Sequence, residues 1–249
     1  MLAPFALAVV GATTLVTSFI SGIFGMAGGM MLLGVLLVFM DVAPAMVLFG
    51  VVQMASNGWR AALWWRRVNW SIVWRFLVGS TLMFLALRSI AVLPSKATLY
   101  LTLGLLPFAA DLLPKSWSLD ITRPGVPYVS GAIIIVLQLL AGAAGHILDV
   151  FFQKSRLDRM TIVGTKAVTQ VMGHVYRILY FGSFEAAIDV SVPWWAYVAG
   201  IGLACAGTSL AALVLVRMTD EGFRMWSRRV TVGVSVTYLV RGLWLVAVP

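Results

Sequence analysis

The sequence predicts an all-α membrane protein with about eight transmembrane helices. Of its 249 residues, 61% are hydrophobic and 11% are charged, whereas soluble domains carry about 45–50% apolar and about 25% charged residues. The apolar residues also form runs close to the roughly 20 residues that a helix needs to cross the hydrocarbon core of a bilayer. A soluble fold could not bury so much apolar surface, so the lipid bilayer is the expected partner of the outer surface.

Eight apolar runs have the length of a transmembrane span: residues 4–22, 43–65, 69–90, 96–113, 126–148, 161–182, 191–217 and 230–248. A shorter apolar stretch, residues 28–40, is predicted to be a half-span or re-entrant piece attached to the first helix. The connections are too short to hold a soluble domain. We therefore divide the chain into a first transmembrane repeat at 1–113, a connecting loop at 114–125 and a second repeat at 126–249.

The formal net charge of +9 is read as a topology signal rather than as a nucleic-acid footprint, because the basic residues lie mostly between apolar runs. Eight alternating spans would place Arg88 and Lys96 in the cytoplasm together with Lys154, and Arg66 and Arg67 on the other side. Both termini would then lie outside. The predicted location is the cell (inner) membrane, with several crossings and no nucleic-acid partner.

Two glycine-rich points interrupt the apolar runs, one near Gly25–Gly29 and one near Gly142–Gly145. Glycine in a helix interior is less favourable than alanine by about 1 kcal/mol, so clustered glycines predict broken or re-entrant segments. Irregular backbone within a membrane is tolerated only where protein or a watery cavity shields it, and paired breaks in two halves are typical of a transporter's binding site. Close helix packing is the alternative explanation.

Each half then carries a polar stripe at helical spacing. The stripe consists of a glutamine, a polar residue four positions later and an arginine three positions after that: Gln53, Asn57 and Arg60 in the first half, and Gln170, His174 and Arg177 in the second. This spacing puts the three side chains on one face of a helix. Polar groups within membrane spans usually face a partner or a cavity, so two such stripes predict a central site. Snorkelling of the basic side chains to the headgroups is the alternative.

The same residues carry a resemblance to a known family. Residues 21–33, Ser-Gly-Ile-Phe-Gly-Met-Ala-Gly-Gly-Met-Met-Leu-Leu, resemble the glycine-rich signature of the sulfite exporter TauE/SafE family of bacterial membrane permeases. Residues 163–166, Val-Gly-Thr-Lys, resemble its short Thr-Lys motif. The sequence departs from the family at Ala27, where glycine is usual, at Gly34, where proline is common, and after Gly145, where further glycines are expected.

The resemblance implies a permease for a small anion such as sulfite, an organosulfonate or a related sulfur or carboxylate compound. Half-helix N-termini offer a positive dipole end and free N–H donors to an anion, and arginine binds oxyanions in bidentate fashion. The predicted substrate-binding residues are Gly25, Gly28, Gly29, Gln53, Asn57, Thr165, Lys166, Gln170 and Arg177.

Two histidines and a carboxylate near the proposed site suggest that transport is coupled to proton movement. His146, Asp149 and His174 are the candidates, since histidine titrates near neutral pH. The alternative is a buried histidine that hydrogen bonds to Asp149 or to backbone freed at the break.

Two other functions stay open beside the secondary transporter. A membrane-embedded enzyme could use the His/Asp cluster, although the sequence contains neither H-E-x-x-H nor G-x-S-x-G. A non-transporting accessory subunit would explain the eroded second glycine signature. We expect no enzyme activity, no cofactor and no metal, and self-association into a homo-oligomer is left open. A phosphate-loop motif is also lacking from the sequence, which argues against direct drive by ATP.

Overall fold

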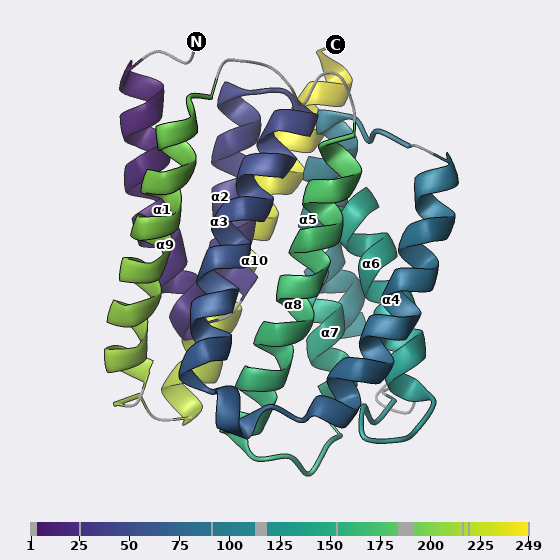
Figure 1. Ribbon diagram of the computed structural model, residues 1–249. Helices are drawn as coiled ribbons and strands as arrows, with labels where there is room; N and C mark the ends of the chain where they lie inside the picture. Colours follow the sequence, from purple (N-terminus) through teal and green to yellow (C-terminus); the bar gives the residue numbers. More distant parts are fainter. Residues whose placement is uncertain are drawn as a thin grey trace.

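All regular structure in the described chain is helical, and the helices stand side by side in one bundle (Figure 1). This computed structural model describes residues 4–24, 26–90, 92–112, 119–152, 154–183, 192–215, 217–218 and 220–248. The helices are α1 (Pro4–Phe24), α2 (Met26–Phe39), α3 (Val42–Leu63), α4 (Trp70–Ile90), α5 (Lys96–Leu112), α6 (Val126–Leu140), α7 (Gly145–Phe152), α8 (Arg159–Phe181), α9 (Trp194–Leu215) and α10 (Asp220–Ala247), with a short 3-10 helix at Trp65–Arg67. The all-α prediction is confirmed for these residues.

Four helices are long and apolar enough to cross a membrane: α1, α4, α9 and the Arg228–Ala247 part of α10. Between 22% and 33% of each apolar window is buried inside the bundle, so most of this apolar surface points outward, as expected for a surface that lipid covers. Helices α3 and α8 are as long, at 22 and 23 residues, but they carry the two polar stripes. They pack against each other in the centre, where other helices shield them.

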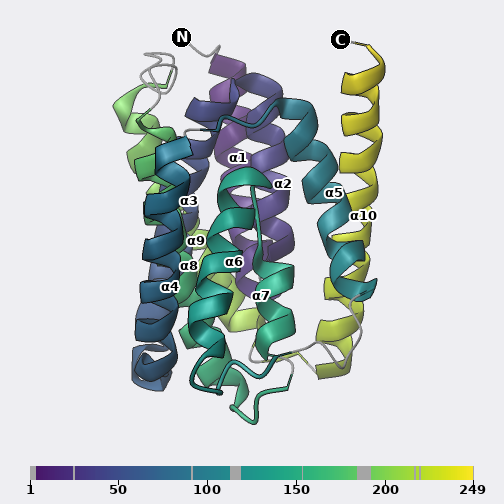
Figure 2. The same cartoon turned by 90° about the vertical axis from the view of Figure 1, so that its right-hand side faces the viewer.

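The helices pack in four extensive pairs: α1 with α9, α4 with α6, α3 with α8, and α5 with α10. The first pair forms one flank of the bundle and the second pair the opposite flank (Figure 1). Helices α5 and α10 lie together at a third side (Figure 2). Both described ends of the chain lie at the same end of the bundle, which is the upper end in Figure 1.

Helices α1 and α6 end inside the bundle, and after each of them the chain turns back. This agrees with the predicted half-span at 28–40 and the predicted break near Gly142. Helix α2 returns beside α1, and α7 returns after α6 (Figures 1 and 2). Gly142 has φ +82°, a left-handed conformation that suits glycine and is common just after a helix ends. The prediction of one continuous span at 126–148 is wrong, because residues 141–144 separate α6 from α7.

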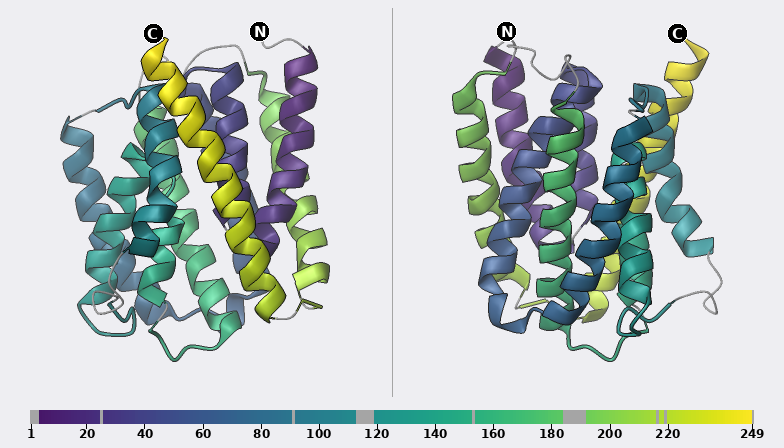
Figure 3. Two further views of the ribbon diagram at one scale, coloured as in Figure 1. Left: turned by 180° about the vertical axis from the view of Figure 1, so that it is seen from behind. Right: turned by 45° about the vertical axis from the view of Figure 1, so that its right-hand side comes forward.

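These two returns also correct the predicted grouping of the loops. Each return adds a reversal that an alternation of eight spans leaves out, so the segments between α2 and α7 run opposite to the prediction. The α3–α4, α7–α8 and α9–α10 connections all lie at the lower end in Figure 1, and the α4–α5 connection lies at the upper end, as the rear view also shows (Figure 3). Arg66 and Arg67 therefore share an end with Lys154, opposite Arg88 and Lys96.

The largest apolar core lies in the upper half, between α2, α3 and the helices around them. It includes Leu33, Leu36, Met46 and Phe49, each no more than 2% exposed. A smaller cluster joins α4 and α6 to α7, for example through Phe76. The two clusters leave the broken segments and the polar stripes of α3 and α8 between them.

Candidate functional site

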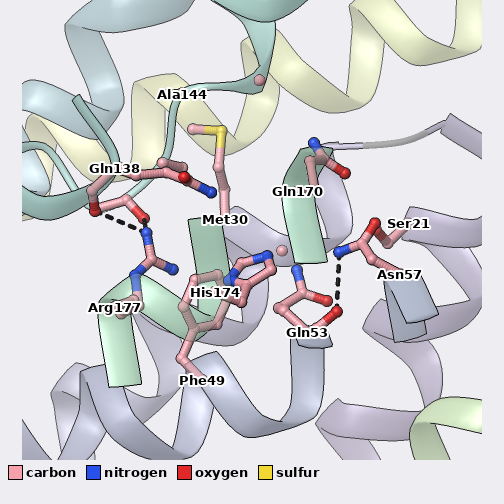
Figure 4. Close-up of a pocket in the computed structure, with 14 residues that line it drawn as sticks. Ser21, Met30, Phe49, Gln53, Asn57, Gln138, Ala144, Gln170, His174 and Arg177 are labelled. Carbon is pink, nitrogen blue, oxygen red and sulfur yellow. Dashed lines mark hydrogen bonds between the residues drawn. The ribbon is translucent and has the colours of Figure 1, made fainter. Parts of the chain in front are cut away.

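A small cavity lies where the two returning helices meet the polar stripes (Figure 4). It measures about 30 Å³, and we call it the central cavity. Its lining combines the N-terminal part of α2, the 142–145 segment before and at the start of α7, and the facing sides of α3 and α8. The lining residues are Ser21, Gly29, Met30, Phe49, Gln53, Asn57, Gln138, Gly142, Ala143, Ala144, Gly145, Gln170, His174 and Arg177.

Arg177 is the most deeply buried charged side chain at this cavity, with no exposed surface. Its Nη2 donates to the carbonyl oxygens of Gln138 at 2.7 Å and Gly142 at 2.6 Å. These carbonyls belong to the C-terminal end of α6 and the break that follows, where a helix leaves carbonyls without partners and where a cation is favourable. Nε and Nη1 of Arg177 have no hydrogen-bond partner in the described chain, so two donors remain beside the cavity.

Arg60 likewise binds a carbonyl at the C-terminal end of α1, the helix that precedes the returning helix α2. Its Nη2 donates to the carbonyl oxygen of Ser21 in the last turn of α1, at 2.8 Å, and its Nη1 donates to Oδ1 of Asn57 at 3.3 Å. Each of the two arginines reaches a carbonyl 39 positions earlier in the chain. Arg60 and Arg177 thus neutralise equivalent helix C-termini in the two halves of the sequence.

Aromatic and amide side chains complete the wall. The guanidinium of Arg177 lies 4.7 Å from the ring centroid of Phe49, and Phe49 meets the His174 ring edge-on at 5.7 Å. Nδ1 of His174 is buried and has no hydrogen-bond partner in the described chain. Asn57 donates to the carbonyl oxygen of Gln53 at 2.9 Å. Unsatisfied buried donors and acceptors are costly, so these groups favour a polar occupant of the cavity.

Glycine at position 29 is what allows the amide of Gln53 to reach the cavity. A methyl group there would overlap Nε2 of Gln53. At Gly173 on α8, a methyl group would likewise overlap the amide of Gln138. Glycine on one helix therefore makes room for a glutamine from another on both sides of the cavity.

The structure brings together five of the predicted substrate-binding residues at the central cavity: Gly29, Gln53, Asn57, Gln170 and Arg177. Three others lie elsewhere. Gly28 packs against the backbone of α1, where a methyl group would overlap the Thr17 carbonyl. Oγ1 of Thr165 accepts from the backbone N–H of Asn69 at 2.9 Å, and Lys166 pairs with Asp149. Gly25 lies outside the described residues.

The predicted coupling residues do not form one cluster within the described part of the chain. His174 lines the central cavity, whereas the carboxylate of Asp149 accepts from Nζ of Lys166. The backbone of His146 belongs to the first turn of α7, but its side chain lies outside the described part. Among the described residues no group of three His, Cys, Asp or Glu side chains could hold a metal ion.

Sequence reasoning missed several lining residues, of which Ser21, Phe49 and Gln138 are the most informative. Gln138 is a lone glutamine inside an apolar run, and such residues within membrane spans usually serve a site. It also stands at the position equivalent to Ser21 when the two halves are aligned on Arg60 and Arg177. That correspondence is the signal by which both residues could have been found.

Comparison with protein-family models decides the relationship. Residues 10–238 match the model described as sulfite exporter TauE/SafE. The chain belongs to the TauE/SafE sulfite exporter family. This match covers most of the 249 residues, including both broken helix pairs and both polar stripes. No curated protein and no solved structure matches the chain. Membership of TauE/SafE agrees with the apolar helices and supports a role as a membrane transporter in general.

Proposed function

We propose that this TauE/SafE protein is a secondary transporter that carries a small oxyanion, such as sulfite or an organosulfonate, through the central cavity. The observation that carries the proposal is the convergence of two half-helix starts on one cavity that also holds a buried arginine. Gly29 and Met30 are the fourth and fifth residues of α2, and Gly145 begins α7. The first N–H groups of a helix have no partner inside that helix, and its N-terminus carries partial positive charge.

The arginines bind the C-terminal ends of helices and leave the N-terminal ends facing the cavity, which supports an anionic rather than a cationic substrate. The carbonyl-bearing C-termini of α1 and α6 are already neutralised by Arg60 and Arg177, so they offer little to a cation. The N-termini of α2 and α7 remain, together with Nε and Nη1 of the Arg177 guanidinium, and Gln53 and Gln170 also line the cavity. This set consists mainly of hydrogen-bond donors, which an oxyanion requires.

The size of the cavity supports a small substrate. A water molecule needs about 10–15 Å³ by the same measure, so 30 Å³ accommodates an occupant of a few heavy atoms. Larger sulfonates would need the walls to move. Transporters change shape during their cycle by rocking one part against another around a fixed site, and the returning helices α2 and α7 are the elements that border this one.

We also propose that the chain consists of two repeats of opposite orientation, residues 1–113 and 126–249, joined by 114–125. One constant offset relates Gln53 to Gln170, Asn57 to His174 and Arg60 to Arg177. The packing supports the same relation, since the pair α1–α9 corresponds to α6–α4, and α3–α8 and α5–α10 each correspond to themselves. Equivalent helices run in opposite directions (Figures 1 and 3). Eight crossings then follow, with α2 and α7 as re-entrant pieces.

The distribution of basic residues supports an inner-membrane protein with its lower end in the cytoplasm. The described lower connections and the adjoining helix ends carry Arg66, Arg67, Arg123, Lys154, Arg156, Arg159, Arg217, Arg228 and Arg229. The upper α4–α5 connection carries Arg88 and Lys96. Cytoplasmic loops hold the excess of lysine and arginine.

This orientation predicts the labelling of single cysteines introduced into a Cys205→Ala background. Lys154→Cys should react with an impermeant thiol reagent only in inverted vesicles, and Ser95→Cys only in right-side-out vesicles, because the two positions lie at opposite ends. The reverse pattern would refute the assignment.

The transport proposal is tested with purified protein in liposomes. We expect saturable sulfite flux and a rise in melting temperature with sulfite, since a ligand that binds only the folded state stabilises it. Arg177→Gln should abolish both, because it removes the buried charge from the cavity. Gln53→Ala should weaken sulfite binding without removing a helix cap, and Arg156→Gln, on the exposed lower loop, is the matched control. Unchanged flux in both cavity variants, with the protein folded, would refute the central site.

A further inference from the structure

A second cavity lies directly below the central one and is rich in positive charge. It measures about 60 Å³ and lies between the lower ends of α1, α3, α8 and α9. We call it the lower cavity. Its lining residues are Ser21, Gly22, Ile23, Arg60, Arg159, Val163, Lys166, Gln170 and Leu215. These described residues include three bases and no acid.

We propose that the lower cavity is an anion-binding vestibule through which the substrate of the central site passes at the cytoplasmic end. This inference rests on the proposed transport function. Ser21 and Gln170 line both cavities, so the two spaces adjoin at these residues. The route therefore needs no new opening through the apolar core.

One face of α8 connects the lower end of the bundle with the central cavity. Arg159, Val163, Lys166 and Gln170 recur at steps of three and four positions, and they share one helix face. All four are half-buried. At 1.5 Å per residue, Arg159 and Gln170 lie roughly 16 Å apart along the axis, and the same face continues to His174 at the central cavity.

The charge balance of the lower cavity calls for an anion. Asp149, from α7, pairs with Lys166, but Asp149 is not among the residues that line the cavity. Arg60 is 8% exposed, and its Nε has no hydrogen-bond partner in the described chain although it lies in the wall of the cavity. Buried or half-buried cations within a membrane protein are costly unless opposite charge offsets them. A small oxyanion in passage would supply that charge.

The position of Arg159 is itself unfavourable for the helix that carries it. It is the first residue of α8, where the helix dipole favours anions and disfavours cations. Removal of this charge should therefore relieve an unfavourable interaction with the dipole of α8.

The equivalent route at the upper end is closed by the apolar core. The constant offset between the repeats maps Arg159, Val163 and Lys166 onto Val42, Met46 and Phe49. These three residues are buried in the largest hydrophobic cluster, at 7%, 0% and 2% exposure. The cationic path is thus a property of the lower half alone, and this conformation offers the anion access from that end.

The test measures the concentration dependence of sulfite transport in inverted vesicles, where the cytoplasmic face is outward. Arg159→Gln should raise KM for sulfite by about three- to tenfold, because one attracting charge is lost from the path, and should leave the maximal rate unchanged. The rise of KM with ionic strength should also become shallower, as expected when a screened charge is removed. A purely structural role would not change that slope.

Two further variants keep the test decisive. Arg159→Lys retains the charge and should restore the wild-type KM, and Arg156→Gln removes a nearby exposed arginine that does not line the cavity. A folded Arg159→Gln protein with wild-type KM and salt dependence would overturn the vestibule while leaving the central site intact. Absence of sulfite flux in the wild-type protein would instead overturn the transport function on which the vestibule rests.

Discussion

A guanidinium buried among helices is stable only if its donors find oxygen atoms, and here helix breaks provide them. Arg60 and Arg177 each bind the carbonyl end of a helix that stops inside the bundle. Removal of either arginine would leave those carbonyls without a cation and the cavity without its charge, so fold and site are coupled at these two residues. Neutral cavity residues are therefore the cleaner probes of substrate binding.

Gly29 provides such a probe. A Gly29→Ala methyl would overlap the Nε2 atom of Gln53, the far end of a flexible side chain that can move away. Helical alanine is favoured over glycine by about 1 kcal/mol, so we expect little change in thermal stability. Loss of one hydrogen bond to an anion, about 1.5–3 kcal/mol, should weaken sulfite binding about tenfold or more, as measured by titration of the melting temperature.

Two other glycine-to-alanine substitutions serve as controls for Gly29→Ala. At Gly202 on α9 nothing lies within 4 Å of an added methyl, so Gly202→Ala should leave binding unchanged and should not lower the melting temperature, since alanine favours a helix by about 1 kcal/mol. At Gly28 the methyl would overlap backbone of α1, so Gly28→Ala should lower the melting temperature. Unaltered sulfite binding by Gly29→Ala would show that Gln53 does not contact the substrate.

At the scale of single residues, the sequence predicted the site correctly where helical spacing alone determines which side chains share a face. Gln53, Asn57, Gln170 and Arg177 follow a period that any helix imposes, and they meet at the cavity. Thr165 was assigned by resemblance to a motif, and Lys166 by that motif together with its spacing of four from Gln170, and both lie away from the central cavity. Their places depend on contacts with Asn69 and Asp149 from other segments, which one-dimensional spacing does not contain.

At the scale of elements, α8 is the helix on which both cavities depend, and its first turn is fixed by a side-chain cap. Asp158 accepts hydrogen bonds from the backbone N–H groups of Met160 and Thr161, each at 3.1 Å. Side-chain oxygens at this position satisfy N–H groups that the helix leaves free. The cap thereby fixes Arg159 as the first residue of α8 and of the helix face that lines the lower cavity.

The cap makes stability depend on pH in a defined sense. The hydrogen bond from the Thr161 side chain, and then those from the backbone N–H groups of Thr161 and Met160, lower the pKa of Asp158 in the folded protein. A carboxyl group whose folded pKa is depressed stabilises the fold above its unfolded pKa, about 3.9, and this contribution disappears as the pH falls through the folded value. Asp158→Ala should lower the melting temperature at pH 7 and reduce its decline below about pH 4.

Asp41 supplies the matched control. It precedes α3 as Asp158 precedes α8, but its side chain makes no capping hydrogen bond, and its ion pair with Lys96 at 3.2 Å is exposed. Exposed ion pairs contribute little, so Asp41→Ala should change the melting curve less at every pH. Equal losses in the two variants would contradict the role of the cap.

The half-helices show how far elements could be predicted. Glycine clusters indicated both breaks, because local backbone preference is written in the sequence. The direction in which α7 leaves the break was not predictable from residues 126–148, since it depends on packing against neighbouring helices. The error in loop grouping followed from that single missing reversal in each half.

For the whole molecule, the two opposed repeats that we propose would explain how one cavity can hold two helix N-termini. Inverted halves turn equivalent breaks toward the same central point from opposite sides, and the packing of α3 against α8 and of α5 against α10 is what such an arrangement requires. The equivalent positions differ in chemistry: those at the lower cavity are basic, and those at the upper end are the apolar residues Val42, Met46 and Phe49. Composition predicted the membrane setting, but this asymmetry emerges only when the repeats are aligned in three dimensions.

The central claim is that an oxyanion occupies the space between the starts of α2 and α7. The most direct measurement is an experimental structure of the protein in lipid with selenite, a strongly scattering analogue of sulfite, at a concentration that saturates transport. We predict density for selenite between the first turns of α2 and α7, in contact with the Arg177 guanidinium. Density for selenite only at other places, with the central cavity free of it, would contradict the account.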